Sequence, residues 1–306
     1  MYQSTPLITS FYINEIYTIH YFEYMSDFDF AGESHDFWEF IYVDKGEVNI
    51  MADRTPITLK KGDIAFHKPN EFHRVTANGV VAPDLVVISF TCNSHPMNFF
   101  RNKVLRLDSL ERNLLAEIVI EARATFSNPL DDPYSQGMIR GENAPFASEQ
   151  LIKLYLQEFL IHLVRRYSNP LVAHKKVSTD PLSKTSKERS DEEIFVRITD
   201  YLEKHLQEKL TIDRICKDNL YSRSKLQKMI NEREGVGIEK YFVLIKIKSA
   251  KQMIRDGQLN FTQIAEKLGY TSIHYFSRQF RKVTGMTPTE YSSSVKARSE
   301  RPRSGI

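Results

Sequence analysis

Cysteine and long apolar runs are both scarce in this sequence. Only Cys92 and Cys216 occur among its 306 residues, which is too few for a disulfide framework or a four-cysteine zinc site and fits a reducing compartment. No segment approaches the roughly 18 consecutive apolar residues of a membrane span. Residues 1–13 also lack the basic start and apolar core of a secretion signal. We therefore expect a cytoplasmic protein with no membrane segment.

Charge is distributed unevenly along the chain, although the formal net charge is only +3. Residues 1–168 contain 15 Lys and Arg against 22 Asp and Glu, a net charge of −7, whereas residues 169–306 contain 27 against 17, a net charge of +10. A basic half joined to an acidic half points to a polyanionic partner, such as nucleic acid, for the second half alone. The length by itself suggests two domains.

The first third of the chain has the pattern of short β-strands. Residues 37–43 are rich in aromatic and β-branched side chains and end at an Asp-Lys-Gly turn signal at 44–46, after which residues 48–51 resume the pattern. A second turn is predicted at residues 59–63, and residues 84–90 form a nearly continuous apolar run that suits a strand buried on both faces. This spacing predicts a β-barrel or a double-sheet jelly roll.

Two helices and a linker are predicted next. Residues 107–126 and 146–167 place apolar side chains at three- and four-residue steps, and Asp108 with Glu111 forms a candidate capping box at the first of them. Residues 169–190 are rich in Ser, Thr, Lys and Arg and poor in large apolar side chains, so they predict a flexible linker. The expected domains are therefore 1–168 and 191–306.

The basic half contains an internal repeat. Apolar and glycine positions recur fifty residues later, with Leu226, Ile230, Gly235 and Tyr241 matched by Phe276, Phe280, Gly285 and Tyr291. Each copy combines a short amphipathic helix, a tight turn, a candidate N-cap (Ser222 or Thr271) and a second helix, which is the pattern of a helix-turn-helix unit. The second helix keeps one face polar and basic, and such side chains can donate to phosphates and base edges. A plain helical bundle with solvated faces is the alternative.

Three segments of the second copy form a long, ordered pattern: IAEKLGY at 264–270, YFSRQFRK at 275–282 and GMTPTEY at 285–291. With these segments, residues 194–296 resemble the DNA-binding domain of the AraC/XylS family of bacterial transcription regulators. The first copy departs from the family pattern at Asn219, where an apolar core residue is usual. Leu220 and Tyr221 are the candidates to take over its packing.

The resemblance implies two recognition helices that enter successive major grooves on one face of double-stranded DNA. It assigns base reading to Ser224, Gln227 and Lys228 in the first helix and to Ile273, His274, Tyr275 and Arg278 in the second. It assigns phosphate contacts to Arg223, Lys225, Arg281 and Lys282. It also implies a homodimer formed through the helices at 107–126 and 146–167, with RNA polymerase as a further candidate partner.

The acidic half carries a degraded form of the first cupin motif. Glu33, His35 and Glu39 occupy its spacing, although Glu33 replaces the first histidine and Asp27 stands in place of the leading glycine; His73 lies near the position expected from the second motif. Nitrogen and oxygen ligands of this kind suit a divalent metal. The cupin-like domains of the family usually keep the fold without the metal, so we expect no metal and no other cofactor.

A small-molecule pocket inside the barrel is the expected sensor site. Its candidate ligand-binding residues are Glu33, His35, Trp38, Glu39, His67 and His73; for Trp38, packing in the core is the alternative to stacking on a sugar-like ligand.

The expected fold class is α+β, with a cupin-like jelly roll and two dimerisation helices followed by an all-α domain with two helix-turn-helix units. The expected function is a transcription factor that responds to a small molecule, by resemblance an activator of carbohydrate genes, and not an enzyme. A metal-dependent cupin enzyme fused to a DNA-binding module is the alternative.

Overall fold

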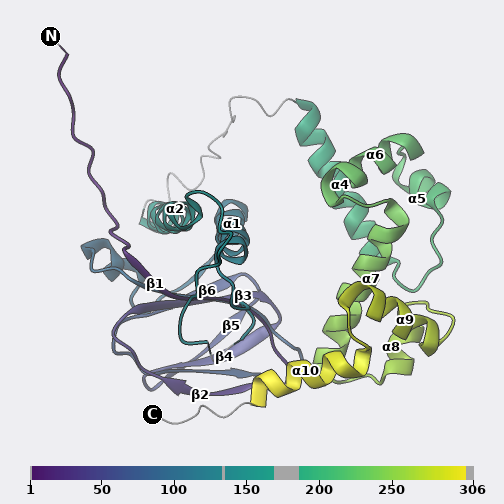
Figure 1. Ribbon diagram of the computed structural model, residues 1–306, viewed down its shortest axis with the longest axis horizontal. Helices are drawn as coiled ribbons and strands as arrows, with labels where there is room; N and C mark the ends of the chain where they lie inside the picture. The colour runs from purple at the N-terminus through teal and green to yellow at the C-terminus, as the bar shows by residue number, and fades with distance from the viewer. Residues whose placement is uncertain (1, 133–134, 169–185, 301–306) are drawn as a thin grey trace. The chain divides into compact units, whose positions relative to one another are not determined.

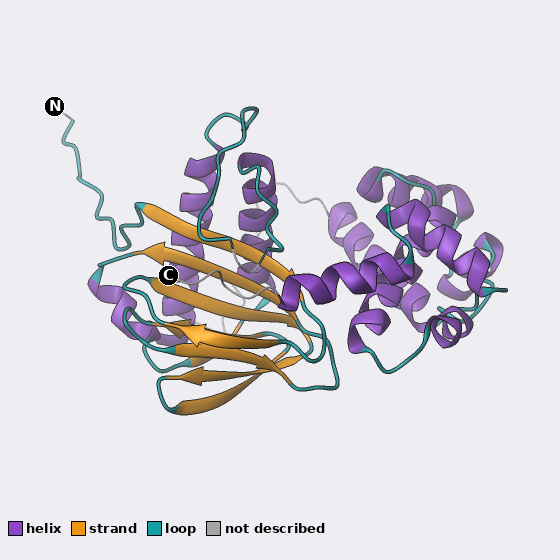
Figure 2. Cartoon of the chain, turned by 60° about the horizontal axis from the view of Figure 1, so that its bottom comes forward, coloured by secondary structure: helices purple, strands orange, loops and turns teal. Residues whose placement is uncertain are grey.

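The computed structural model describes residues 2–132, 135–168 and 186–300. They form two compact units, one made of the residues up to Ser168 and the other running from Ser186 to Ser294 (Figure 1). All the strands belong to the first unit, and the second is helical (Figure 2). The α+β fold class expected from the sequence is therefore confirmed.

The first unit contains a sandwich of two antiparallel sheets. Its strands are β1 (Glu15–Glu23), β2 (Asp29–Glu33), β3 (Trp38–Lys45), β4 (Glu47–Ala52), β5 (Thr55–Lys60), β6 (Asp63–His67), β7 (His73–Ala77), β8 (Asp84–Thr91) and β9 (Val104–Arg106). One sheet has the order β1-β8-β3-β6-β9 and the other β2-β7-β4-β5. This confirms the double-sheet prediction. The apolar run at 84–90 lies in β8, which is almost entirely buried between β1 and β3.

Alternation along β3 sends neighbouring side chains to opposite faces of its sheet. Trp38 and Phe40 belong to a core shared with helices α1 (Ser109–Thr125) and α2 (Ser148–Ser168). Ile41 and Val43 belong to a second core between the two sheets. The helices therefore cover the outer face of the five-stranded sheet (Figure 1), and the inner faces of the sheets enclose a separate interior.

Helix α1 begins at the capping box predicted from the sequence. The Asp108 carboxylate accepts a hydrogen bond from the backbone N–H of Glu111, and the Glu111 carboxylate accepts one from the backbone N–H of Asp108. The buried Glu111 carboxylate also pairs with Arg166 of α2, which links the two helices. Leu110 and Ile120 of α1 remain exposed, on the side of the helix that does not contact the sheet.

The second unit contains helices α4 (Ser186–Lys204), α5 (Ile212–Asn219), α6 (Arg223–Glu234), α7 (Ile238–Asp256), α8 (Phe261–Lys267), α9 (Ile273–Thr284) and the first half of α10 (Pro288–Glu300). Helices α5 and α6 form one helix-turn-helix and α8 and α9 the other, with α7 between them in the chain (Figure 1). The N-cap of α9 is Ser272 and not Thr271 as expected, because the Ser272 hydroxyl is the one that accepts the backbone N–H of Tyr275.

Most of the predicted linker, residues 169–185, lies outside the described residues. Helix α4 already begins at Ser186, inside the segment expected to be flexible, because the Lys, Glu and Arg side chains at 187–189 are good helix formers. Among the residues that the structure describes, no helix is both long enough and apolar enough to cross a bilayer.

Candidate ligand-binding and DNA-binding sites

A cavity of about 290 Å³ lies between the two sheets. Inward-facing side chains of β1, β2, β3, β7 and β8 line most of it, and Ser135 and Gln136 from the loop before α2 also contribute. Phe22, Phe28 and Phe30 are among several aromatic side chains in its wall. The volume is close to the lower limit of small-molecule sites, roughly 300 Å³, so the cavity suits a compact ligand.

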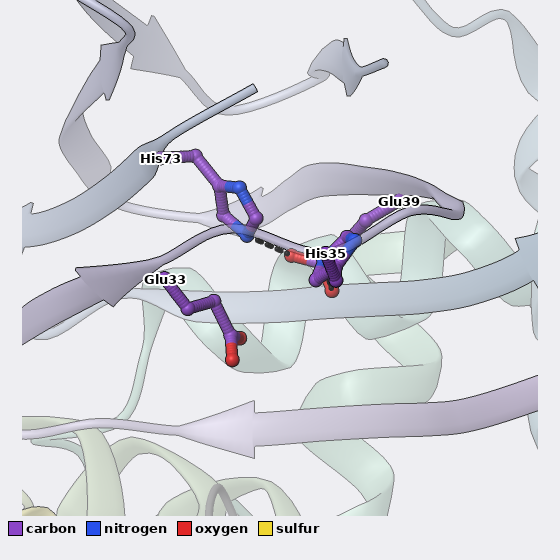
Figure 3. A group of neighbouring side chains, drawn as sticks. All are labelled: Glu33, His35, Glu39 and His73. Carbon is purple, nitrogen blue, oxygen red and sulfur yellow. Dashed lines mark ion pairs between the residues drawn. The ribbon is translucent and has the colours of Figure 1, made fainter. Parts of the chain in front are cut away.

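Four polar side chains converge in this cavity: Glu33, His35, Glu39 and His73 (Figure 3). Glu39 contacts both histidines, because its Oε2 lies 3.6 Å from Nε2 of His35 and its Oε1 lies 3.3 Å from Nε2 of His73. Long-range strand pairing assembles the group, since Glu33 of β2 is the register partner of His73 of β7. These four of the six predicted ligand-binding residues are thus neighbours.

Fixed partners orient the side chains of this cluster. Nδ1 of His35 lies 3.1 Å from the Phe37 carbonyl oxygen, and Nδ1 of His73 lies 3.1 Å from the Glu71 carbonyl oxygen. A carbonyl only accepts hydrogen bonds, so both Nδ1 atoms carry the proton and both Nε2 atoms face the cluster. The hydroxyl of Ser89 donates a 2.6 Å hydrogen bond to Oε2 of Glu39.

Burial and charge set the protonation of the cavity. Burial alone would raise the pKa of Glu39, but interactions with His35 and His73 hold that pKa well below its ordinary value. Burial alone would lower the pKa of His73, but the neighbouring Glu39 carboxylate outweighs it and raises that pKa. His20 also lines the cavity, and burial lowers its pKa. The cavity therefore contains the ionised carboxylate of Glu39. Of its histidines, His73 has a pKa shifted towards the protonated form and His20 a pKa shifted towards the neutral form.

The other two predicted ligand-binding residues do not line the cavity. Trp38 is one residue before Glu39 in β3, so its side chain faces the helices and is buried in the outer core, 4% exposed. Of the two roles considered for Trp38, packing in the core describes its position, and its place among the candidate ligand-binding residues does not hold for this cavity. His67 lies behind His73, with ring centroids 4.4 Å apart, and its Nδ1 is 2.9 Å from a carboxylate oxygen of Glu71.

Several aromatic residues of the cavity wall were not predicted as site residues. The ring of Phe37 stacks between His35 and Tyr17, with centroid separations of 3.8 Å on each side. Phe37 and Ile41 lie two residues on either side of Glu39, so they share its face of the strand. The alternation of β3 is the sequence signal that could have placed them in the wall.

Helices α6 and α9 present the predicted DNA-binding side chains on their surfaces. The exposed ones are Arg223, Ser224, Lys225, Gln227 and Lys228 in α6, and His274, Tyr275, Arg278, Arg281 and Lys282 in α9; Ile273 is half-buried. The opposite faces hold the buried side chains Leu226, Ile230, Phe276 and Phe280. Each helix therefore combines a buried apolar face with an exposed face that contains hydrogen-bond donors.

Both units match known family models. Residues 15–92 match an AraC-like ligand binding domain, and residues 215–294 match a helix-turn-helix domain. The chain belongs to the AraC/XylS family of transcriptional regulators. It is an AraC-family regulator with a ligand-binding domain followed by a DNA-binding domain.

This AraC-family chain is similar to regulators from several bacteria. The transcriptional activator RhaR of Escherichia coli is 23% identical over 276 residues, which cover 86% of each chain. The probable transcriptional regulator LumQ of Photobacterium leiognathi is 29% identical over 149 residues, which cover 47% of this chain and 59% of LumQ. A crystal structure of ToxT from Vibrio cholerae matches 94% of this chain and 98% of ToxT, with 15% identity and a TM-score of 0.34.

The first helix-turn-helix of this AraC-family regulator accommodates its unusual Asn219 by hydrogen bonding. The buried side-chain amide donates to the Ile215 carbonyl at 2.9 Å, and the Asn219 carbonyl accepts from the Arg197 guanidinium at 3.2 Å. Leu220, expected to pack in the core, is instead 92% exposed with φ of 53°, because this turn requires a left-handed residue. Tyr221 does pack partly against the core, as expected.

Proposed function

We propose that the cavity between the sheets binds a small, neutral, hydroxyl-rich molecule such as a sugar, and that this molecule controls transcription. The supporting observation is the lining of the cavity. The carboxylates of Glu33 and Glu39 would repel an anion but accept hydrogen bonds from hydroxyl groups. The ring of Phe30 in the cavity wall offers an apolar surface against which a sugar ring can pack.

A thermal-shift screen tests this ligand class. Neutral monosaccharides and polyols are compared with sugar phosphates and fatty acids, and a true ligand raises the melting temperature by mass action. Phe30→Ala, which removes part of the cavity wall, should abolish the shift, whereas Phe146→Ala, at a side chain that is 99% exposed, should leave it unchanged. Stabilisation by anionic compounds alone would show that the proposed ligand class is wrong.

We also propose that α6 and α9 read successive major grooves, about 34 Å apart. Base contacts are assigned to Ser224, Gln227, Lys228, Ile273, His274, Tyr275 and Arg278, and phosphate contacts to Arg223, Lys225, Arg281 and Lys282. Arg281→Ala should weaken binding to all sequences alike and reduce the slope of log affinity against log salt by about one. A change in sequence preference in this variant would instead make Arg281 a base-reading residue.

We infer that the regulator is a homodimer formed through α1 and α2, where Leu110, Ile120 and Leu154 are exposed. Ile120→Asp should shift sedimentation equilibrium towards the monomer. Ile139→Asp is the matched control, because Ile139 is 63% exposed but lies in a loop outside both helices. Equal behaviour of the two variants would place the dimer contact elsewhere.

Activation of transcription, rather than repression, is our proposal for the outcome of binding, and relatives named as activators support it. It implies a contact with RNA polymerase and action in the cytoplasm. We propose no enzymatic activity. Chromatography of the ligand after incubation with the protein checks this, since any conversion of the ligand would support the enzyme alternative.

A further inference from the structure

We propose that Glu33, His35, Glu39 and His73 bind one divalent transition-metal ion in the cavity of the sensor domain. From the sequence we expected no metal, because Glu33 replaces a histidine of the cupin motif and Asp27 a glycine. The geometry nevertheless supports a metal site, since one donor atom from each of the four side chains lies within 4.8 Å of the others (Figure 3). Donors that share one ion at ~2.1 Å lie at most ~4.2 Å apart, so only a small closure of the group is needed.

The two histidines are oriented as metal ligands are. A ligating imidazole usually donates its second ring N–H to a carbonyl or a carboxylate, which directs the other nitrogen at the ion. His35 and His73 both make this contact, through Nδ1 to the carbonyls of Phe37 and Glu71. Neither Nε2 has a hydrogen-bond partner in the described part of the chain. His73 is only 1% exposed, so a coordinated ion would satisfy a nitrogen that solvent hardly reaches.

The carboxylates supply the charge that a dication requires. Glu39 lies 3.3–3.6 Å from both Nε2 atoms, which is longer than a good hydrogen bond, and it is held there by the hydroxyl of Ser89. Ser89 in turn contacts the hydroxyl of Thr18 at 2.8 Å, so the ligating carboxylate has a supporting hydrogen-bond chain. When both imidazoles bind the ion through an unprotonated Nε2, so that His73 gives up its extra proton, the four ligands carry a charge of −2, which one dication neutralises inside the domain.

The surroundings of His73 add rigidity behind the proposed ligand. His67 stacks on the His73 ring at a centroid distance of 4.4 Å and is itself held by a carboxylate oxygen of Glu71. Lys68 pairs with the other carboxylate oxygen of Glu71. The backbone carbonyl that fixes the His73 tautomer therefore belongs to a residue whose own side chain is anchored twice, which keeps the ligand geometry fixed.

The donor set selects the class of metal. Two imidazole nitrogens with two carboxylate oxygens suit Zn²⁺, Fe²⁺, Mn²⁺ or Ni²⁺, whereas Mg²⁺ and Ca²⁺ prefer oxygen ligands only. The ion would face the space where we propose that the effector binds, and effector hydroxyls could complete its coordination. That second step rests on the proposed function, but the binding of the metal does not.

Metal binding is measured directly on the full chain. Protein without an affinity tag is stripped with a chelator, then titrated with Zn²⁺ and, in parallel, with Mg²⁺ by calorimetry, and Co²⁺ is added to a further sample to record its absorption spectrum. We expect one Zn²⁺ per chain, a higher melting temperature with Zn²⁺, weak or no binding of Mg²⁺ and a Co²⁺ spectrum typical of nitrogen and oxygen ligands. His73→Gln and Glu39→Gln should weaken Zn²⁺ binding by at least about tenfold.

A matched surface pair provides the control. His162 lies 3.5 Å from Glu158 on α2 and is partly exposed, so His162→Gln should leave Zn²⁺ binding unchanged. If the buried His73 variant does not fold, His35→Gln and Glu33→Gln carry the same test at less buried positions. The proposal is overturned if Zn²⁺ does not bind saturably, if Mg²⁺ binds equally well, or if the cluster variants bind like His162→Gln. Sugar binding by metal-free protein is scored separately, so either proposal can fail alone.

Discussion

The two helix-turn-helix units share one scaffold but differ in how their turns are stabilised. In the first unit, Arg197 of the preceding helix donates to the carbonyl of Asn219 at 3.2 Å. In the second, Lys246 donates to the carbonyl of Leu268 at 2.8 Å. Both donors and both acceptors are related by the same shift of forty-nine residues. The repeat therefore includes the helix that precedes each helix-turn-helix. In both copies a cationic side chain of that preceding helix donates to the backbone carbonyl at the end of the first helix of the helix-turn-helix.

In the second helix-turn-helix, the residues of the turn and of the N-cap favour the observed backbone more strongly than those of the first. Its turn uses Gly269 with φ of +68°, where the first unit uses Leu220 with φ of 53°. Its first helix begins with a capping box formed by Asn260 and Gln263, whereas the corresponding helix of the first unit has a single capping hydrogen bond, which the Thr211 hydroxyl accepts from the backbone N–H of Arg214. We expect the second unit to fold more stably and the first to tolerate change more readily.

The largest expected effect follows from exchanging the turn residue of the second unit. A Cβ atom on Gly269 would lie 2.1 Å from the Gln207 carbonyl oxygen, on a backbone that already has positive φ. Gly269→Leu should therefore lower the free energy of unfolding by about 3 kcal/mol through clash and strain together. Urea unfolding followed by far-UV circular dichroism measures this, because most of the helix of the described residues lies in the helical DNA-binding domain that contains both helix-turn-helix units.

Two controls separate the causes of the Gly269 effect. Gly285 also has positive φ, but a Cβ atom added there would meet no other part of the described chain within 4 Å, so Gly285→Leu should lose only about 1–2 kcal/mol from strain. Fluorescence of Trp38, the single tryptophan, reports the β-sandwich domain and should show an unchanged transition. Equal losses in the two glycine variants would mean that contact with Gln207 has no importance.

A smaller effect is expected on DNA binding, and it should differ between the two recognition helices. Lys228 of α6 lies 3.6 Å from Glu232 on its own helix, whereas the sequence of α9 contains no acidic residue near Arg278. Arg278→Ala should weaken binding to a selected site by about 1–3 kcal/mol and relax its sequence preference. Lys228→Ala should lose less than about 1 kcal/mol, because its ion pair must first be broken. Competition mobility shifts measure both, and a larger loss for Lys228 would reverse the comparison.

Local patterns in the sequence predicted the local features, and tertiary contacts explain what they missed. The Asp108 capping box and both helix-turn-helix units follow from residue types a few positions apart. The cavity cluster instead requires β2 to pair with β7, so spacing could name Glu33 and His73 but not bring them together. The choice between the two roles of Trp38 depended on which face of β3 is its own, because a shift of one residue along a strand reverses the face.

The cation–carbonyl contacts were missed for a related reason. Lys246 is a charged residue on a helix, and nothing in its neighbours in sequence shows that it is buried, 7% exposed, beside the rings of Phe242 and Tyr270. Its role is visible only when helix α7 is packed against the second unit. The repeat offset was the available signal, since it relates Lys246 to Arg197.

Removing these two cations should affect the units unequally. Lys246→Met keeps the apolar stem but leaves the Leu268 carbonyl without its donor, so we expect a loss of about 1.5 kcal/mol of unfolding free energy. Arg197 is exposed and its hydrogen bond is longer, so Arg197→Met should lose less than about 0.5 kcal/mol. The urea midpoints of the two variants are compared. Equal losses of unfolding free energy would mean that the burial of Lys246 adds nothing to the strength of its hydrogen bond with the Leu268 carbonyl.

The smallest effect expected is a gain, and it comes from the turn of the first unit. Leu220 adopts φ of 53° and ψ of 44° with a side chain that is 92% exposed, so it bears the strain of a left-handed residue without the benefit of packing. Leu220→Gly should raise the free energy of unfolding by about 0.5–1 kcal/mol, because relief of strain exceeds the added freedom of the unfolded chain. Leu220→Ala keeps the Cβ atom and should gain nothing, and Leu220→Asn should fall between the two. If the alanine variant gained as much unfolding free energy as the glycine variant, the exposed leucine side chain would be the cause. Backbone conformation would then not explain the difference between the two turns.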